Sequence, residues 1–270
     1  MVKSDVNDWS GRMQMGGQVC AITHMVGGRS ALRLDIIVIS DDAWRMRYPG
    51  GKGKCYQRLI NLMPPHQTYI QTHLGAGAVL RHKKPAARNI GVDIDPAVHD
   101  AWIDHQVESL ELIQGDASSY LSSFSYDGSE LIYADPPYVT ETRRRPKIYR
   151  FEYDLAQHEQ LLCTLRSVPC KVMISGYDSP LYNETLHGWR KVTFMAKTHT
   201  DLREECVWMN YAAPQELHDS SYLGDTFRER QTIARRHSRL RERVDAMDPV
   251  ERNDFLRWIT QTYGSVQEAR

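Results

Sequence analysis

Short strand-like segments alternate with helical patterns through the middle of this chain, and this alternation constrains the fold more than any other feature. The strand-like runs are Thr68–Leu74, Asn89–Ile94, Leu110–Gln114, Leu131–Ala134, Lys171–Ser175 and Cys206–Tyr211. The helical patterns between them are Gln57–Leu62, Ala78–His82, Pro96–Gln106 and Leu155–Ser167. Strands separated by helices predict an α/β fold, with a parallel sheet and helices on both of its faces.

The chain has 270 residues, which suits one large α/β domain with a small appendage. Residues 1–45 are rich in Gly, Met and Ser and lack sustained periodicity, so we expect an accessory or poorly ordered segment there. We expect the main domain over residues 46–214. Residues 215–270 are expected to form a helical extension, because 227–244 and 250–262 have helical patterns.

Composition excludes several classes of protein. Hydrophobic residues make up 41% and charged residues 25%, which suits a globular protein with a core. The longest apolar run near the start, Ile36–Ile39, is far shorter than the roughly 20 residues that span a bilayer, and the N-terminus lacks a signal-peptide pattern. The five cysteines form no C-x-x-C pair, so we expect reduced thiols, no metal site and a cytoplasmic protein. The cysteines are Cys20, Cys55, Cys163, Cys170 and Cys206.

A glycine turn at residues 75–77 follows the first strand of the main domain. Glycines at a strand-to-helix turn let the backbone approach a ligand at the carboxyl edge of a sheet. Asp93 and Asp95 end the next strand, where a carboxylate can accept hydrogen bonds from ribose hydroxyls. Because the full G-x-G-x-x-G spacing is absent, a nucleoside cofactor without a pyrophosphate is favoured over NAD. The alternative is that both aspartates only cap the helix that opens at Pro96.

The motif Asp135-Pro136-Pro137-Tyr138 follows the apolar strand Leu131–Ala134 directly. The exocyclic amine of adenine is a poor nucleophile because its lone pair is delocalised into the ring. A carboxylate and a backbone carbonyl can accept its two hydrogens, and proline supplies that carbonyl on a rigid backbone. The tyrosine ring can stack on a base flipped out of a duplex. The alternative is a Pro-Pro turn in which Tyr138 only packs.

The order of these motifs resembles the Dam-like family of DNA adenine methyltransferases. The resemblance runs from about Met46 to Tyr211 and rests on Tyr48-Pro49-Gly50-Gly51-Lys52, Gly75-Ala76-Gly77, Asp93, Gly115-Asp116 and Asp135-Pro136-Pro137-Tyr138. It implies a Rossmann-like, seven-stranded methyltransferase sheet and S-adenosylmethionine as the methyl donor. It also implies that DNA is the partner.

The resemblance further implies roles for individual residues. Asp93 would hold the cofactor ribose, Asp116 would lie beside the cofactor adenine, and Asp135 and Tyr138 would receive the target base. The implied cofactor-binding residues are Tyr48, Gly51, Lys52, Gly75, Ala76, Gly77, Asp93, Ile94 and Asp116. The implied catalytic residues are Asp135, Pro136, Pro137 and Tyr138.

Two features depart from the family pattern. The strand before the glycine turn usually reads Glu-Pro-Phe in the family, whereas Gln71-Thr72-His73 stand here, which puts the details of cofactor binding in question. The family also usually inserts a target-recognition domain before Asp-Pro-Pro-Tyr. Only Ala117–Ala134 fills that interval, so we expect relaxed specificity, similar to prophage-type members of the family.

Two basic clusters are candidates for contact with nucleic acid. The first follows the catalytic motif, where basic side chains can hold phosphates and Tyr149 can stack or wedge. Its candidate residues are Arg143, Arg144, Arg145, Lys147 and Tyr149. The second cluster is the set of arginines between 228 and 243, for which a solvated helix face and a DNA contact are both consistent with the sequence.

The sequence therefore predicts direct methyl transfer from S-adenosylmethionine to the N6 amine of adenine in DNA. No covalent intermediate is needed, so no cysteine is expected to be catalytic. An RNA adenine methyltransferase is the nearest alternative, because the same motif can serve either nucleic acid. A catalytically inactive relative that binds nucleic acid is the alternative that Gln71 prompts. A protein-glutamine methyltransferase is less favoured, since that class usually carries Asn in place of Asp135.

Overall fold

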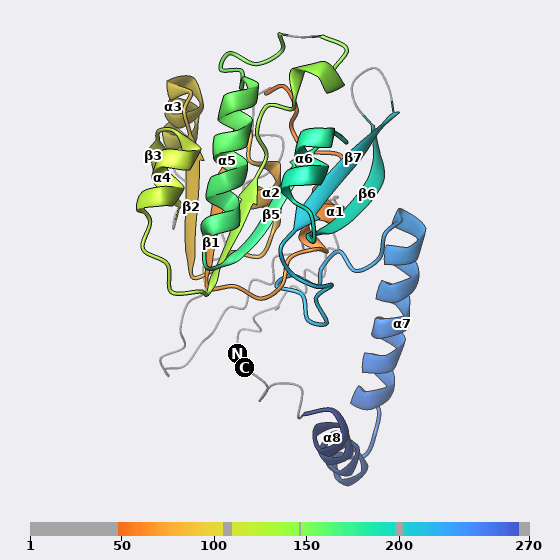
Figure 1. Ribbon diagram of the computed structural model, residues 1–270. Coiled ribbons are helices and arrows are strands. Elements are labelled where there is room, and N and C mark those ends of the chain that lie inside the picture. The colour runs from red at the N-terminus through yellow and green to blue at the C-terminus, as the bar shows by residue number, and fades with distance from the viewer. Residues whose placement is uncertain (1–47, 105–109, 146, 198–201, 265–270) are drawn as a thin grey trace, which may run out of the picture. The chain divides into compact units, whose positions relative to one another are not determined.

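The computed structural model describes residues 48–104, 110–145, 147–197 and 202–264 (Figure 1). All of these residues belong to one compact unit, Arg47–Arg270. The expectations for residues 1–45, including the reduced thiol of Cys20, lie outside these ranges.

One seven-stranded sheet forms the centre of the fold, with the strand order β3-β2-β1-β4-β5-β7-β6. Its strands are β1 (Thr68–Thr72), β2 (Arg88–Asp93), β3 (Leu110–Gln114), β4 (Glu130–Ala134), β5 (Lys171–Gly176), β6 (Arg190–Lys197) and β7 (Leu202–Met209). The pairs among β1 to β5 are all parallel, whereas β7 runs antiparallel to both β5 and β6. The sheet is therefore mixed at one edge, and it has the seven strands of the expected Rossmann-like fold.

Helices cover both faces of this sheet (Figure 1). They are α1 (Tyr56–Ile60), α2 (Ala78–His82), α3 (Pro96–Asp104), α4 (Ala117–Ser123), α5 (Leu155–Ser167) and α6 (Pro180–Thr185), with a short 3₁₀ turn at Thr140–Thr142. Helix α5 contacts α4 and α6 on one face, and α1 contacts α2 on the other. The α/β fold class predicted from the alternating pattern is confirmed.

The core lies between the sheet and the layer of α4, α5 and α6. Both β1 and β4 are buried along their whole length. This burial explains why Leu131–Ala134 of β4 reads as a continuous apolar run, whereas β1 keeps polar side chains such as Gln71 in buried positions. Leu121 of α4 and Leu161 and Leu165 of α5 are fully buried against Ile132 and Val172 of the sheet. This packing fixes the strand ends from which the candidate site is built.

The strand order reverses direction between β1 and β4. From β1 the chain proceeds outward to β2 and β3, and it then returns to place β4 on the other side of β1. At such a reversal the loops that follow the two central strands diverge, and they leave a crevice at the carboxyl edge of the sheet. The predicted glycine turn and the predicted catalytic motif follow β1 and β4, respectively.

The chain continues after the sheet into two helices, α7 (Phe227–Asp245) and α8 (Pro249–Tyr263), and neither contains a buried residue. The segment that leads into α7 is tied to the main fold. Tyr211 donates a hydrogen bond to the carbonyl oxygen of Leu62, and Arg58 donates one to that of Asp225. The expected C-terminal helices are thus present. Among the described helices, none combines the length and apolar character of a membrane span.

Candidate functional site

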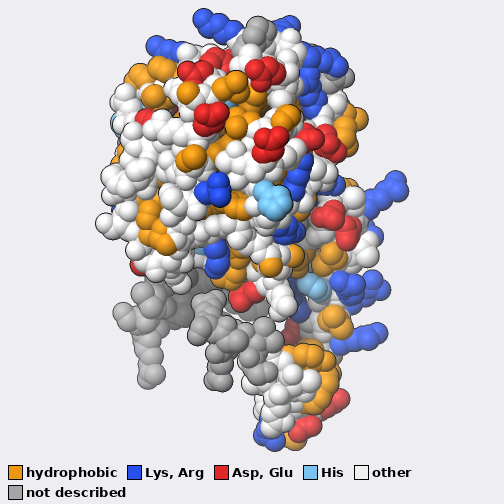
Figure 2. Space-filling model, viewed as in Figure 1, with side chains coloured by type: hydrophobic (Ala, Val, Ile, Leu, Met, Phe, Trp, Pro, Cys, Tyr) orange, Lys and Arg blue, Asp and Glu red, His pale blue; other side chains and the backbone are white. Residues whose placement is uncertain are grey.

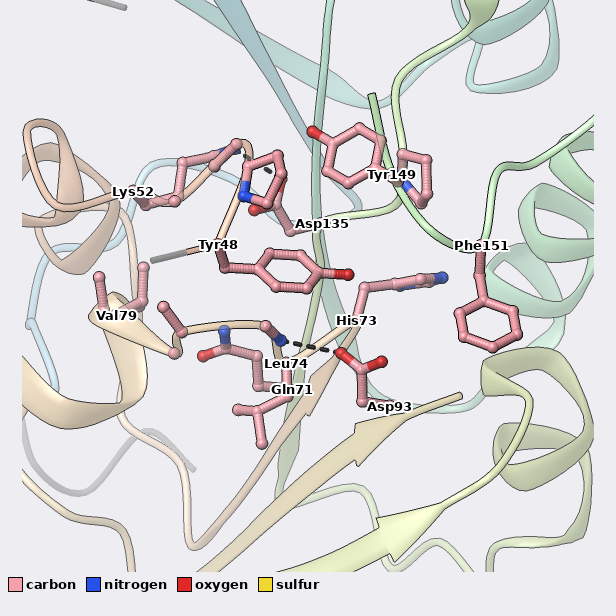
Figure 3. Close-up of a pocket in the computed structure, with 18 of the residues that line it drawn as sticks. Tyr48, Lys52, Gln71, His73, Leu74, Val79, Asp93, Asp135, Tyr149 and Phe151 are labelled. Carbon is pink, nitrogen blue, oxygen red and sulfur yellow. Dashed lines mark hydrogen bonds and ion pairs between the residues drawn. The ribbon is translucent and has the colours of Figure 1, made fainter. Parts of the chain in front are cut away.

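A pocket opens at the carboxyl edge of the sheet, at the reversal between β1 and β4 (Figure 3). The hollow has an empty volume of about 590 Å³, which includes space open to solvent. Its walls come from the chain before α1, the ends of β1, β2 and β4, and the loop before α5. The lining residues are Tyr48, Pro49, Gly50, Gly51, Lys52, Gln71, His73, Leu74, Gly75, Ala76, Gly77, Ala78, Val79, Asp93, Ile94, Asp135, Pro137, Tyr149, Phe151 and Tyr153.

The turn after β1 needs glycine for both conformation and space. Gly75 and Gly77 have φ values of 47° and 56°, in the left-handed region. A Cβ on Gly77 would lie 2.3 Å from the ring of Trp102, and one on Gly75 would lie 2.7 Å from the ring of Tyr48. The Trp102 indole also donates a hydrogen bond of 2.8 Å to the carbonyl oxygen of Gly75. The turn is therefore held closely against α3, with its amides at the pocket.

Asp93, at the end of β2, closes one side of the pocket. One carboxylate oxygen accepts from the amide of Gly75 at 2.8 Å (Figure 3), and the other accepts from the amide of Asp95 at 2.9 Å. Burial raises the pKa of the Asp93 carboxyl, and these two amide hydrogen bonds oppose the rise. Asp95 caps α3 through the amide of Ala97 and pairs with Arg150 at 3.0 Å. The capping role considered for Asp95 in the sequence is thus present.

The other side of the pocket carries a compact charged cluster that we call the Lys52 cluster: Lys52, Asp135, Tyr138 and Glu205. The Lys52 ammonium lies 2.7 Å from Asp135 Oδ1 (Figure 3). It lies 3.9 Å from Glu205 Oε2. It also donates a hydrogen bond of 2.7 Å to the hydroxyl of Tyr138, which in turn donates to Glu205. All four side chains have little contact with solvent. One cation thus serves two buried carboxylates.

Burial and mutual attraction set the protonation states in this cluster. Burial alone lowers the pKa of Lys52, but the carboxylates of Asp135 and Glu205 outweigh it and hold that pKa well above its usual value. Burial raises the pKa of Asp135, and the neighbouring Lys52 ammonium opposes the rise. Burial, followed by the charge on Glu205, raises the pKa of Tyr138. Lys52 is therefore a fixed positive charge beside the carboxylate that faces the pocket.

The strand residues that depart from the family pattern also line the pocket. The Gln71 side chain is buried and accepts a hydrogen bond of 3.1 Å from Tyr69. His73 has a φ of 55° and bonds through Nε2 to the hydroxyl of Tyr153 at 2.9 Å. Burial lowers the pKa of His73 to about 3, so its imidazole is neutral at pH 7. The side of the pocket beside β1 therefore has uncharged polar groups where the family usually has a carboxylate.

The aromatic side chains near Asp135 differ in their exposure. Tyr138, which the sequence singled out for base stacking, is 5% exposed, and its ring lies edge-on to that of Tyr177 at 4.5 Å. Tyr149 and Tyr177 are half-buried. The Tyr149 ring is 6.2 Å from that of Tyr48, which lies across the middle of the pocket in Figure 3. In this arrangement Tyr149 and Tyr177 offer more ring surface than Tyr138.

The basic loop after the catalytic motif is organised by Glu152. This carboxylate receives two hydrogen bonds from the Arg143 guanidinium, at 3.1 and 2.7 Å, and the backbone amides of Ile148 and Tyr149. Arg143 has only 3% of its side chain exposed and is charge-compensated. Of the other predicted contacts, Arg144, Arg145 and Lys147 are exposed. The loop therefore presents fewer available cations than its sequence suggests.

Most of the predicted site residues meet at this pocket. Of the nine predicted cofactor-binding residues, only Asp116 is absent from its lining, and of the catalytic motif Asp135 and Pro137 reach it. The Asp116 side chain caps α4 through Ser119, and it interacts with Tyr153, which does line the pocket. Glu205 and Glu152 were missed by the sequence analysis.

Two expectations from the sequence concern the cysteines and metal binding. Cys55, Cys163, Cys170 and Cys206 are free thiols, and none of them lines the pocket. In the part of the chain that the structure describes, no group of three or more His, Cys, Asp or Glu side chains is placed to hold a metal ion.

No known family model matches the sequence, and no curated protein matches it. Solved structures match at the level of fold. TrmN from Thermus thermophilus is 13% identical over 58% of this chain, with a TM-score of 0.41, and the match spans 47% of TrmN, about half of its length. The 23S rRNA methyltransferase ErmE is 10% identical over 70% of this chain and 83% of its own, with a TM-score of 0.40. TrmK from M. capricolum, solved with S-adenosyl-homocysteine, is 8% identical over 80% of this chain and 97% of its own, also with a TM-score of 0.40.

Proposed function

We propose that this chain is an S-adenosylmethionine-dependent methyltransferase that modifies the N6 amine of adenine in a nucleic acid, with DNA as the first candidate substrate. The observation that carries the proposal is that the glycine turn, Asp93 and Asp135 all face one pocket. These groups come from the ends of three neighbouring strands, where the sequence predicted a cofactor and a base to meet. The order of motifs that resembles the Dam-like family supports the same function.

The residues that line the pocket suit the cofactor on two counts. Asp93 already accepts two amide hydrogen bonds, but a carboxylate has about four lone-pair sites, so it can still accept from ribose hydroxyls. Gln71 and the neutral His73 supply polar contacts without charge. When bound, S-adenosylmethionine supplies an electrophilic methyl group on a sulfonium.

Asp135 is the group that acts on the target amine. Its carboxylate accepts one amine hydrogen while the carbonyl oxygen of Pro136 accepts the other, which favours a pyramidal nitrogen with an available lone pair. Lys52 holds Asp135 in place, since the two lie 2.7 Å apart. Positioning and polarisation of this kind are the main contributions that an enzyme makes to a direct displacement. Accordingly, we assign no catalytic role to any cysteine.

Specificity follows from what occupies the interval between Asp116 and Asp135. Helix α4 and strand β4 fill it, together with the turn between them, and they leave no room for a target-recognition domain. Sequence is read by side chains that reach base edges in a groove. We therefore propose methylation of adenine in many contexts, with a preference for at most one or two flanking bases.

The short interval between Asp116 and Asp135, which leaves no room for a target-recognition domain, also makes RNA the second candidate substrate. An adenine in a single-stranded loop of RNA is already unstacked, so an enzyme without a recognition domain can reach it without opening a duplex. The polarisation of the amine by Asp135 is identical for the two nucleic acids. The choice between them depends on the surfaces outside the pocket.

Methyl transfer from a radiolabelled donor tests this proposal. Purified protein is incubated with duplex DNA, single-stranded DNA and structured RNA, each also prepared with every adenine replaced by 2-aminopurine, which lacks the N6 amine. We expect incorporation into at least one adenine-containing substrate and none into its 2-aminopurine counterpart. Cofactor binding without incorporation into any of them would instead support the inactive, nucleic-acid-binding relative. Equal incorporation into both versions would contradict adenine N6 as the target.

A further inference from the structure

Helix α7 carries an unusual density of positive charge. Seven of its 19 residues are arginine, against three acidic residues. None of its residues is buried, so the helix is not fixed in the main core. In Figure 2, blue side chains project along the edge where Figure 1 draws α7.

Five of these arginines share one face of the helix. With 3.6 residues per turn, Arg228, Arg235, Arg236, Arg239 and Arg243 fall within an arc of about 100°. All five are exposed. The residues of α7 that are partly covered, including Ile233, His237 and Val244, lie on the other side. We call this set of five arginines the α7 arginine face.

The charge on this face is not neutralised within the described part of the chain. No ion pair joins any of the five guanidinium groups to a described carboxylate within 4.0 Å. Two of the three acids of the helix have other partners: Glu229 accepts from the amide of Asp225, and Glu242 accepts from the hydroxyl of Ser238. Arg235, Arg239 and Arg243 follow one another at intervals of four residues, and like charges at that spacing destabilise a helix. A bound polyanion would remove that repulsion.

The spacing of the face fits a nucleic-acid backbone. With a rise of 1.5 Å per residue, arginines four residues apart are separated by about 6 Å along the helix, and the whole face is about 22 Å long. One strand of a duplex presents a phosphate about every 3.4 Å along its axis. The strand also winds around the duplex axis once in about 34 Å, so the straight face contacts phosphates where it crosses a backbone, and its length lets several arginines do so.

We propose that the α7 arginine face binds the phosphate backbone of a double-stranded nucleic acid. The inference rests on the proposed function and deepens it, because it assigns the substrate contact that the loop at 143–150 only partly provides. Contacts of this kind are independent of sequence, which agrees with relaxed specificity.

The test compares a variant that loses positive charge on the α7 arginine face with a variant that loses the same charge at positions off that face. The variant Arg235→Gln/Arg239→Gln/Arg243→Gln takes away three charges of the face. The matched control, Arg241→Gln/Arg252→Gln/Arg257→Gln, takes away three arginine charges that lie off the face. Glutamine is a good helix former, so α7 should persist, which circular dichroism checks. Both variants are made in the 270-residue chain.

Fluorescence anisotropy then measures binding to labelled duplex DNA and duplex RNA between 50 and 200 mM salt. Each lost phosphate contact flattens the slope of log K against log salt by about 0.9 for duplex DNA. For the face variant, the magnitude of that slope is expected to fall by about two to three, and the affinity is expected to fall roughly tenfold or more. The control variant should remain close to wild type in both. Whichever duplex, DNA or RNA, shows the larger loss of affinity for the face variant is the one that the face binds. Equal losses in the two variants, or no loss in either, would overturn the proposal.

Two further measurements separate this inference from the proposed function. Cofactor affinity, measured by calorimetry, should be the same in the face variant and wild type. A face variant that loses duplex binding while wild type transfers no methyl group would uphold the inference and refute the proposed function. If polyglutamate competes with the duplex for wild type as strongly as unlabelled DNA and RNA do, the face is a site for an acidic protein and the inference is wrong.

Discussion

Replacing Lys52 with methionine removes the one cation that serves two buried carboxylates. Its ammonium lies 2.7 Å from Asp135 and 3.9 Å from Glu205. At an effective dielectric constant of about 20, Coulomb's law gives attractions of about 6 and about 4 kcal/mol. Desolvation of the charges offsets most of this sum. The loss in free energy of unfolding expected when one partner of a buried pair is removed is about 3–5 kcal/mol.

A second substitution tests whether repulsion between the carboxylates causes that loss. With Lys52→Met in place, Glu205→Gln removes one of the two uncompensated charges, so it should restore part of the stability. In the wild-type background the same change should destabilise by about 1–3 kcal/mol, because Tyr138 loses a charged acceptor. The two losses should therefore not add. The double variant should be more stable than the sum of the two single losses predicts, by more than the roughly 1–3 kcal/mol that Glu205→Gln costs in the wild-type background.

Urea denaturation of the four proteins measures these effects, with Lys54→Met as the control. Lys54 is exposed two residues away, and its variant should stay within about 0.5 kcal/mol of wild type. The pH profile of methyl transfer gives a second readout. Loss of the Lys52 charge raises the pKa of Asp135 further, so the acidic limb of the profile should move to higher pH. If the stability of Lys52→Met stays within about 0.5 kcal/mol of wild type and the acidic limb of its pH profile does not move, a structural and electrostatic role for Lys52 is refuted.

Three further predictions follow from individual residues. Asp93→Asn should weaken S-adenosylmethionine binding at least about tenfold, or about 1.4 kcal/mol, and leave nucleic-acid affinity unchanged; unaltered calorimetric affinity would make Asp93 only a support for the turn. Burial lowers the pKa of His158 to about 4, so below the unfolded value of about 6.5 the unfolded chain takes up a proton that the folded chain does not. As the pH falls from 7 to 5, His158 should therefore lower the free energy of unfolding by about 2 kcal/mol. His158→Phe should flatten that dependence in urea titrations and the exposed His187→Phe should not; equal slopes would contradict the assignment. A chain that starts at Met46 should bind cofactor and transfer methyl groups as the full chain does, because every motif lies after that point; an inactive or insoluble product would show that residues 1–45 belong to the working domain.

The elements that the sequence predicted well are those whose pattern is set by burial alone. The central strands lie between two helical layers, so β4 appears as an unbroken apolar run over Leu131–Ala134, and β1 is buried along its whole length. Helix α5 begins at a capping box on Asp154 and matches its predicted bounds. The missed elements have weaker signals: α4 and α6 are short, and β6 lies at the edge of the sheet, where it pairs with β7 and mixes polar with apolar residues without a regular period.

For the candidate site, the sequence predicted the groups that follow parallel strands, because those ends always meet at one edge of a sheet. It missed Glu205, whose position depends on the direction of β7. Because β7 runs antiparallel, its residue Cys206 pairs with Gly176 at the carboxyl end of β5. This brings the preceding Glu205 to the same edge as Asp135. The pairing of Arg143 with Glu152 was missed for a similar reason, since it depends on how a loop folds back on itself.

The central claim is that Asp135 prepares the N6 amine of adenine for methylation. The most direct test is to digest treated DNA and RNA and to identify the methylated nucleoside by mass spectrometry, for wild type and for Asp135→Asn, which keeps the shape of the side chain. We predict N6-methyladenine from wild type, a loss of at least about a hundredfold in the variant, and cofactor affinity within about threefold of wild type by calorimetry. Full production of N6-methyladenine by Asp135→Asn, or a different methylated base from wild type, would contradict the account.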